Sequence, residues 1–542
     1  MRYQSMSPAE QLTAKSTKGL PKTAWLIICL SVLLIVGRTI LWHVYFDPTD
    51  KRDQKFIENR EAVTGMHCAN DRSRWATVAT LVENNTFVID DVDRRRGKLG
   101  NWGTIDKVYH SDRKGREHFY SSKPPLYTTI VAIQYWLLKQ VTGLNIFEAP
   151  MLTIKILTFI NQGLVFALIL ILLARIGHQE ITNNHLYYLY LTALSFGTFL
   201  STFAVSLNNH LPAALFSLLA VLECRRISLQ PHNHPAGFVL IGFYCAMTVT
   251  FELPSLAFLC LVGIWLLTIS IRNTIFFGVP AIAVVAFLYL GINYLAHDSW
   301  RPPYTHRSDG KVLEVLSLED GDSLVAGILP DNLDLLTESM PGMGNYRVEE
   351  HPSQGRWRIF DYSNNVRYAL VRKGTTYELR DWDNWYDYEV AGRKSYWLPG
   401  QAEGVDLGET SRSKYLLHLT VGHHGFFSLT PIWIFGLLGI LLAFRAQHAF
   451  WTPLSRITLS ITLILFLFYV MRPLQDRNYG GVASGFRWMF WIVPLYALHL
   501  PRGLNAVSKS FFLTVLFIIA VAISIYSAHY AFLNPWQNPW PY

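Results

Sequence analysis

Two short polar segments hold the residues best suited to chemistry. Asp71 lies in an Asn-Asp-Arg-Ser-Arg-Trp-Ala segment, residues 70–76, and Lys123 opens a Lys-Pro-Pro-Leu motif, residues 123–126. A single carboxylate can remove the proton of an attacking hydroxyl. A cation placed where water is scarce can hold the charge of a leaving phosphate. An acidic residue at the start of the first segment and a Lys-Pro-Pro at the start of the second together suggest an enzyme that works at a membrane surface.

Residues 71–85 have the spacing of a helix that lies on a membrane surface. Trp75, Val78 and Val82 recur at helical spacing, and the segment is too polar to cross a bilayer. Asp71 stands at the start of this helix, where aspartate is a favoured cap that contributes about 1 kcal/mol. Capping is therefore the alternative role for Asp71.

Further polar residues fall in loops on the same predicted face. Arg477 and Arg487 are basic residues of a late loop on this face. Residues that could contact a substrate are Arg74, Tyr120, Asn209, His210 and Glu252. A carboxylate at a membrane boundary is costly enough to indicate function by default. These residues could instead have structural roles. Residues 208–210 could form an ordinary turn, and the basic side chains could anchor the chain at the membrane interface.

The elements that must position these residues are membrane helices. Hydrophobic residues make up 51% of the chain and charged residues 16%, and the apolar residues gather in runs, as in polytopic membrane proteins. The candidate runs are 24–42, 124–141, 151–173, 185–205, 211–222, 236–250, 254–271, 274–296, 425–444, 452–471, 486–500 and 511–532. The sequence predicts an all-α membrane protein with about 11 to 13 transmembrane helices.

The positive-inside rule orients these helices. Basic residues at positions 175, 225–226, 272, 445, 502 and 509 alternate along the chain so that they fall on one side, which is expected to be cytoplasmic. Segment 124–141 is out of phase with this pattern, because it starts on the outer side and could either span or re-enter. We therefore expect an odd number of spans, with the C-terminus outside.

Two hydrophilic stretches divide the chain into four parts. These are a cytoplasmic tail at 1–23, a transmembrane module at 24–296 with a first external loop at 47–123, an extracytoplasmic insertion at 297–424, and C-terminal helices at 425–542. Within the insertion, residues 356–360, 366–372 and 376–379 alternate apolar with polar residues, which predicts antiparallel strands. Trp382 and Trp385 follow among carboxylates and could stack on sugar rings. They could equally form the core of the small domain.

The segment from Asp71 to Leu126 resembles the first external loop of GT-C glycosyltransferases, particularly the protein O-mannosyltransferase and aminoarabinose-transferase families. Arg74-Trp75-Ala76 takes the place of an Arg-Tyr-Ala motif in that loop, and Asp71 falls on the first residue of an acidic pair whose second place is held by Arg72. The Lys-Pro-Pro-Leu motif matches outright. Later in the chain, Gly480-Gly481 and Gly485-Phe486-Arg487 are similar to a glycine-rich stretch of these enzymes.

This resemblance implies transfer of a sugar from a polyprenyl-phosphate donor to an envelope lipid, glycan or protein, with inversion at the anomeric carbon. It implies Asp71 as general base and Lys123, Arg477 and Arg487 as ligands of the donor phosphate. We expect no metal or other cofactor, although one branch of the superfamily uses a divalent ion. The expected partners are the donor, the acceptor and the lipid bilayer.

The expected location is a plasma membrane such as the bacterial inner membrane, with the site on the extracytoplasmic face. A formal charge of +8 without a basic stripe argues against nucleic-acid binding. The competing functions are a membrane transporter, which would show charges within its spans or duplicated broken helices, and a non-catalytic envelope scaffold.

Overall fold

The structure is a computed structural model that describes residues 19–41, 66–95, 102–229, 235–316, 346–361, 366–531 and 534–542. Each of the predicted apolar runs contains a helix within this part of the chain. The helices before the insertion are α2 (Lys22–Leu41), α6 (Pro125–Thr142), α7 (Pro150–Thr158), α8 (Leu164–Glu180), α9 (Asn184–Phe196), α10 (Phe199–Phe203), α11 (His210–Leu229), α12 (Pro235–Phe251), α13 (Leu256–Ile269), α14 (Ile271–Asn273) and α15 (Val279–His297). The insertion ends with α18 (Arg412–Thr420), and the helices after it are α19 (Ile432–Phe444), α20 (Trp451–Val470), α21 (Val493–Val507) and α22 (Phe511–Tyr530). The prediction of a helical membrane protein is confirmed.

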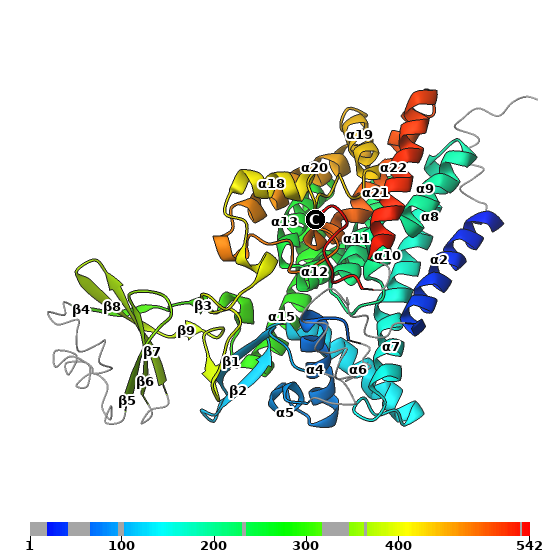
Figure 1. Cartoon of the computed structure of the whole chain (residues 1–542). Coiled ribbons are helices and arrows are strands. Elements are labelled where there is room, and N and C mark those ends of the chain that lie inside the picture. The colour runs from blue at the N-terminus through cyan, green and yellow to red at the C-terminus, as the bar shows by residue number, and fades with distance from the viewer. Residues whose placement is uncertain are drawn as a thin grey trace, which may run out of the picture.

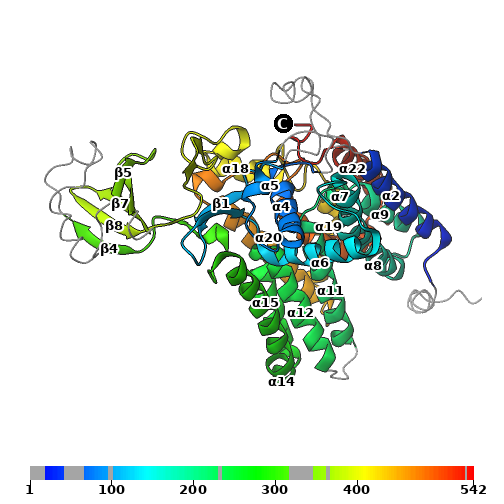
Figure 2. The same ribbon diagram turned by 90° about the horizontal axis from the view of Figure 1, so that it is seen from below.

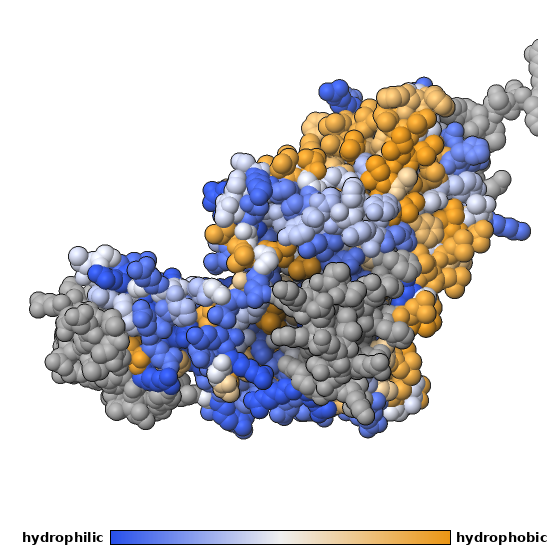
Figure 3. Space-filling view, viewed as in Figure 1, coloured by the Kyte–Doolittle hydropathy of each residue, from blue (hydrophilic) through white to orange (hydrophobic). Residues whose placement is uncertain are grey.

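Helix length supports fewer crossings than the sequence suggested. In the described ranges, five helical stretches are long and apolar enough to span a bilayer: Lys22–Leu41, Pro150–Glu180, Ile271–His297, Trp451–Val470 and Phe511–Tyr530. Three further apolar helices are shorter. The run at 185–205 is broken because α9 ends at Phe196 and α10 begins at Phe199. These stretches make the chain an integral membrane protein, and Figure 3 shows apolar surface along α2, α8 and α22.

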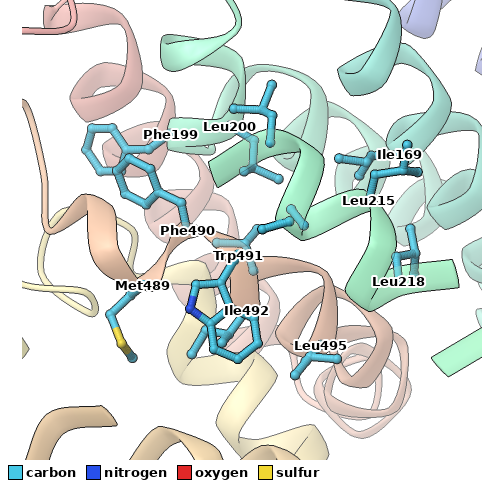
Figure 4. Packing of buried hydrophobic residues seen from close by; sticks show 14 of the residues in the cluster. Ile169, Phe199, Leu200, Leu215, Leu218, Met489, Phe490, Trp491, Ile492 and Leu495 are labelled. Carbon is cyan, nitrogen blue, oxygen red and sulfur yellow. The ribbon is translucent and has the colours of Figure 1, made fainter. Parts of the chain in front are cut away.

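The helices enclose a core that joins the two halves of the chain. Figure 4 shows residues of α10 and α11 packed against the turn Arg487–Ile492, a 3-10 helix labelled η8 that leads into α21. Phe199 stacks on Phe490 with ring centroids 5.4 Å apart, and Trp491 is fully buried. This packing fixes η8, and with it Arg487 at its first residue, against the start of α11.

Polar contacts join the C-terminal ends of three helices. Arg225 of α11 forms an ion pair with Glu180 at the end of α8, with 3.0 Å between the charged atoms. Asn505 of α21 donates to the carbonyl of Glu180 over 2.7 Å. The ends of α8, α11 and α21 therefore lie on the same side of the molecule.

The first external loop folds against the outer ends of the helices. It contains α4 (Ala69–Glu83), α5 (Asp90–Asp93), and a hairpin of β1 (Lys107–Ser111) and β2 (Glu117–Ser121). The sequence predicted that α4 lies on a membrane surface, but its residues from Asn70 to Thr80 are buried except Arg72. The helix is instead an internal element that packs on α6.

The insertion forms the predicted β-domain. Its five-stranded antiparallel sheet has the order β4 (Val312–Leu316), β8 (Thr376–Asp381), β7 (Val366–Lys373), β6 (Arg356–Asp361) and β5 (Tyr346–Glu350), and it stands apart from the helices in Figures 1 and 2. The predicted strands at 356–360, 366–372 and 376–379 coincide with β6, β7 and β8. The short strands are β3 (Arg307–Ser308), β9 (Asp383–Asn384), β10 (Glu389–Val390) and β11 (Arg393–Lys394).

The insertion is tied to the first loop through a stack of aromatic rings. Trp385 lies between His306, with centroids 3.5 Å apart, and His110 of β1, with centroids 4.0 Å apart. The carbonyl of Trp385 accepts a hydrogen bond from the amide of Tyr109 over 2.9 Å. This junction holds the region around Trp385 of the insertion against β1 of the first loop.

Candidate functional site

A cavity of about 1010 Å³ lies where the first loop, the insertion and the helix ends meet. The residues that line it come from segments 68–74, 105–106, 122–124, 209–210, 249–254, 304–307, 386–406, 468–488 and 536. Segments far apart in the sequence thus share one wall. Six of the residues predicted as functional line it: Arg74, Lys123, Asn209, His210, Glu252 and Arg487.

Arg74 is held by neutral partners. Its guanidinium donates to the carbonyl of Asn70 over 3.0 Å, to the side-chain oxygen of Asn70, and to the side-chain oxygen of Asn209 over 2.6 Å. Asn209 in turn donates to Glu252 over 2.6 Å. The first loop therefore contacts the start of α11 and the end of α12 through one chain of hydrogen bonds.

Arg487 reaches the same wall from the far end of the sequence. Its Nε donates to the carbonyl of Gly480 over 2.5 Å, and its Nη1 lies 3.0 Å from Nε2 of His210. Gly480 has a φ of 94°, and a Cβ added there would lie 2.5 Å from Nε of Arg487. A side chain at position 480 would be both strained and in collision, so this glycine allows the arginine to bind where it does.

Two pairs of an acidic and a basic residue also line the cavity. Lys123 forms an ion pair with Asp106, with 3.1 Å between Nζ and Oδ1. His210 bonds Glu252 through its Nδ1. Asp106 was not predicted from the sequence, because a single aspartate in a loop before a short strand carries no distinguishing pattern.

Three arginines in or beside the cavity lining form no direct ion pair within the described part of the chain, although the Asp106 carboxylate acts electrostatically on Arg74 and Arg487. Among the described residues, no ion pair joins Arg72, Arg74 or Arg487 to a carboxylate, and Nε of Arg72 is buried without a hydrogen-bond acceptor. We call Arg72, Arg74, Lys123 and Arg487 the basic wall. Buried charges in proteins are usually paired, because an unpaired one is costly to desolvate. The basic wall is therefore suited to bind an anion.

The charges of the basic wall act on one another. Burial lowers the pKa of Lys123, the Asp106 carboxylate opposes that effect, and the charges of Arg74 and Arg487 lower the pKa further. Burial alone would raise the pKa of Asp106, but the charge and hydrogen bond of Lys123 and the charges of Arg487 and Arg74 bring it below its ordinary value. Asp106 is therefore ionised at neutral pH.

Asp71 does not line the cavity, in contrast to the role predicted for it. It is completely buried at the third position of α4, where Oδ1 accepts from the amide of Cys68 over 2.9 Å and Oδ2 from the amide of His67 over 2.8 Å. Ser206 donates to Oδ2 over 3.3 Å. With the Cys68 side chain facing the amide of Asp71, this is a capping box. The placement favours the capping alternative.

Arg477 and Tyr120 also lie outside the cavity. Arg477 donates to the carbonyl of Thr410 over 2.9 Å and is not part of the lining. Tyr120 is buried under the hairpin and stacks on His110, with centroids 4.2 Å apart. The local sequence could not predict that these two residues lie outside the cavity. In a loop or a short strand, the residue type does not show which way the side chain faces.

Trp382 and Trp385, which were predicted to contact the substrate, do not line the main cavity, whereas other aromatic residues of the insertion do. Trp385 is packed in the junction described above, and Trp382 lies beside a separate small hollow within the insertion. The aromatic residues that the insertion contributes to the main cavity are Tyr304, Tyr386, Tyr396 and Trp397. The density of aromatic and acidic residues was the correct signal for the region, although it did not identify the side chains.

Part of the cavity rim is apolar and exposed. Leu253, Phe468 and Val482 line the cavity and are 42%, 42% and 43% exposed, respectively. The outward faces of α13 and α20 beside them carry further exposed apolar residues, among them Leu256 and Leu467. An apolar chain could therefore pass from the helix surface into the cavity. No group of three or more His, Cys, Asp or Glu side chains suited to a metal ion occurs in the described part of the chain.

Comparisons with known proteins gave fold-level likeness alone. No family model matches the chain, and no curated protein matches it. Among solved structures, the oligosaccharyltransferase of Archaeoglobus fulgidus, tethered to an acceptor peptide or bound to an inhibitory peptide and a dolichol-phosphate, is similar over 95% of this chain at 10% identity and a TM-score of 0.43. The chain spans 56% of the length of that protein. The protein O-mannosyltransferase complex of S. cerevisiae, bound to its sugar donor, is similar over 99% of this chain and 93% of its own, at 12% identity and a TM-score of 0.42.

Proposed function

We propose that this protein is a membrane glycosyltransferase of the GT-C type, which moves a sugar from a polyprenyl-phosphate donor to an acceptor hydroxyl at the outer ends of its helices. The observation that carries this proposal is the basic wall, which places four cations on one side of the cavity; among the described residues, Arg72, Arg74 and Arg487 form no direct ion pair with a carboxylate. The resemblance of residues 71–126 to the first loop of GT-C enzymes supports the same assignment.

The donor is a lipid phosphate because the cavity combines two surfaces. The basic wall matches a phosphate, for which arginine offers several donors in a fixed plane. The exposed apolar rim at Leu253, Phe468 and Val482 matches an isoprenoid chain that arrives from the bilayer. Because burial strengthens each charge–charge contact, the phosphate would be held most firmly at the inner end of the cavity.

The reaction requires one bond to form as another breaks. The acceptor oxygen attacks the anomeric carbon, the bond from that carbon to the phosphate oxygen breaks, and the configuration inverts. The basic wall stabilises the lipid phosphate that leaves, so that no general acid is needed. The acceptor proton passes to a carboxylate.

We assign that carboxylate to Asp106 in place of Asp71. Asp106 lines the cavity and is ionised beside Lys123, whereas both oxygens of Asp71 are occupied by backbone amides. Donor binding draws the Lys123 ammonium toward the phosphate, which leaves Asp106 free to accept the proton. An ionised carboxylate within reach of the hydroxyl can accelerate the step by about 10²- to 10⁴-fold.

Lys123 provides the test of this function. Purified protein should release sugar from a polyprenyl-phosphate sugar donor, and Lys123→Ala should lower kcat/KM by about 10- to 100-fold, since a hydrogen bond to a charged group contributes about 1.5–3 kcal/mol. Lys123→Arg should restore part of the loss, because a planar guanidinium cannot fully replace a point charge.

The control is Lys139, which is bonded to Glu83 at 2.6 Å and does not line the cavity. Lys139→Ala should keep the wild-type donor kinetics. Wild-type donor kinetics in a folded Lys123→Ala variant would count against the proposal.

A further inference from the structure

The outer part of the cavity has a different character from the basic wall. We call Tyr386, Tyr396, Trp397, Glu403 and Asp406 the outer wall; all of them belong to the insertion and line the cavity. Glu403 is exposed, whereas Tyr396, Trp397 and Asp406 are partly buried. The outer wall is therefore the side from which a molecule outside the bilayer can enter.

The outer wall is held in place by its own hydrogen bonds. The hydroxyl of Tyr396 donates to Oδ2 of Asp406 over 3.1 Å, and Asn478 donates to Oδ1 of Asp406 over 3.2 Å. The indole nitrogen of Trp397 donates to the carbonyl of Ile105 over 3.0 Å, next to Asp106. The ring of Trp397 is thus fixed close to the proposed base before any acceptor binds.

The charge of the outer wall is acidic. The cavity arginines on this side, Arg307 and Arg472, both form ion pairs with Asp476, at 3.2 Å and 2.7 Å. Within the described residues, no ion pair joins Asp406 to a cation, and its two oxygens accept hydrogen bonds from Tyr396 and Asn478. An acceptor that carries phosphate or carboxylate groups would be repelled here. The outer wall therefore favours a neutral acceptor.

The residue types select among neutral acceptors. Aromatic faces pack against the C–H faces of sugar rings, and planar carboxylate and amide groups bind neighbouring hydroxyls through paired hydrogen bonds. A peptide would instead need a strand edge or deep apolar pockets. Between Lys394, where β11 ends, and Gly404, where the next helical turn begins, the chain forms no strand.

We infer that the acceptor is a neutral carbohydrate, bound by the outer wall so that one hydroxyl faces Asp106. This inference rests on the proposed glycosyltransferase function. Trp397 is the stacking platform, and Asp406, oriented by Tyr396 and Asn478, bonds the hydroxyls of the same sugar.

Saturation-transfer NMR on the detergent-solubilised full chain tests the inference. The probes are maltotriose, α-1,6-mannotriose and chitotriose as neutral glycans, an oligogalacturonate as an acidic glycan, and a Ser/Thr-rich peptide. We expect at least one neutral glycan to bind. Trp397→Ala and Asp406→Asn should each weaken its binding by about tenfold or more, as expected for a central aromatic or hydrogen-bonding contact.

Trp382→Ala is the matched control, because Trp382 is a tryptophan of the same insertion that lies outside the cavity lining; it should bind the glycan as the wild type does. Two variants are used so that misfolding of one leaves the other informative. The inference is overturned if the peptide or the acidic glycan binds in preference, if no neutral glycan binds, or if the folded variants bind as the wild type does. Undecaprenyl phosphate is also titrated into the wild type. If the wild type binds this lipid but none of the neutral glycans, this inference alone is contradicted, whereas failure to bind the lipid contradicts the proposed function.

Discussion

At the scale of single residues, the site depends on which carboxylate faces the cavity. Asp71 and Asp106 lie in the same loop, but the amides of His67 and Cys68 take up both oxygens of Asp71, whereas Asp106 faces Lys123 across the cavity wall. The two residues therefore have separable roles, one in the stability of α4 and the other in proton transfer.

Substitution of each aspartate by asparagine separates these roles. Asp71→Asn presents an amide nitrogen to one of two buried backbone amides, so it should reduce stability by about 1–3 kcal/mol and leave transfer within about tenfold of the wild type. Asp106→Asn loses the ion pair with Lys123 and should lower the melting temperature somewhat, but the folded variant should lose about two to four orders of magnitude in turnover. Melting curves and steady-state transfer rates of both variants show which aspartate acts as the base and which stabilises α4. An inactive Asp71→Asn variant with an unchanged melting temperature would return the base to Asp71.

The pH dependence of transfer identifies the base independently. A base must be unprotonated, so activity falls as the pH drops through its pKa. The pKa of Asp106 lies below its ordinary value of 3.8, whereas burial raises the pKa of Asp71 and that of Asp406 above theirs. With Asp106 as the base, kcat/KM should stay level from about pH 7 down to about pH 5. A fall in kcat/KM within that range, together with a loss of turnover of about two to four orders of magnitude in Asp406→Asn, would show that Asp406 is the base instead.

At the scale of elements, the junction between the β1–β2 hairpin and the insertion decides the shape of the cavity. Trp385 fills this junction between His110 and His306, and Trp397 reaches the carbonyl of Ile105 from the same side. The sequence identified the aromatic cluster, but it could not show which rings face the cavity. In a short irregular segment, neither helical nor strand periodicity assigns a side chain to a face.

Loss of the Trp385 ring should therefore affect the site as a whole. Truncation of a packed tryptophan to alanine costs about 3–5 kcal/mol, so Trp385→Ala should increase cleavage of the insertion in limited proteolysis. Donor hydrolysis and transfer should fall together, because the outer wall would no longer be held over the basic wall. Trp382→Ala provides the comparison. A Trp385→Ala variant that resists protease, keeps donor hydrolysis and loses only transfer would place Trp385 in acceptor binding instead.

At the scale of the whole molecule, composition and periodicity gave the class of protein, and contacts over long sequence separations gave the site. The apolar runs largely coincide with helices, because helices buried in lipid and helices buried in protein are both built from apolar residues. There are more apolar runs than helical stretches long enough to cross a bilayer. This is because helices in the protein interior are as apolar as lipid-facing ones and need not cross the bilayer. Arg74, Asn209, Glu252 and Arg487 were each suggested by local sequence, but only the fold places them on one wall. The role of Asp106 could not be predicted from the sequence. It depends on contact with Lys123, and the two residues are separated in the sequence by the whole β1–β2 hairpin.

Binding of a lipid phosphate tests the central claim most directly. Undecaprenyl phosphate is titrated into the protein in nanodiscs and compared with undecaprenol, which lacks the phosphate, for the wild type, Arg487→Met and Arg477→Met. Arg477 is a buried arginine of the same late loop that does not line the cavity. We expect the wild type and Arg477→Met to bind the phosphate form more tightly than the alcohol, and Arg487→Met to bind it about 10- to 100-fold more weakly than the wild type. Equal binding of the two lipids by the wild type, or equal losses in the two variants, would contradict the assignment of the basic wall as the donor site.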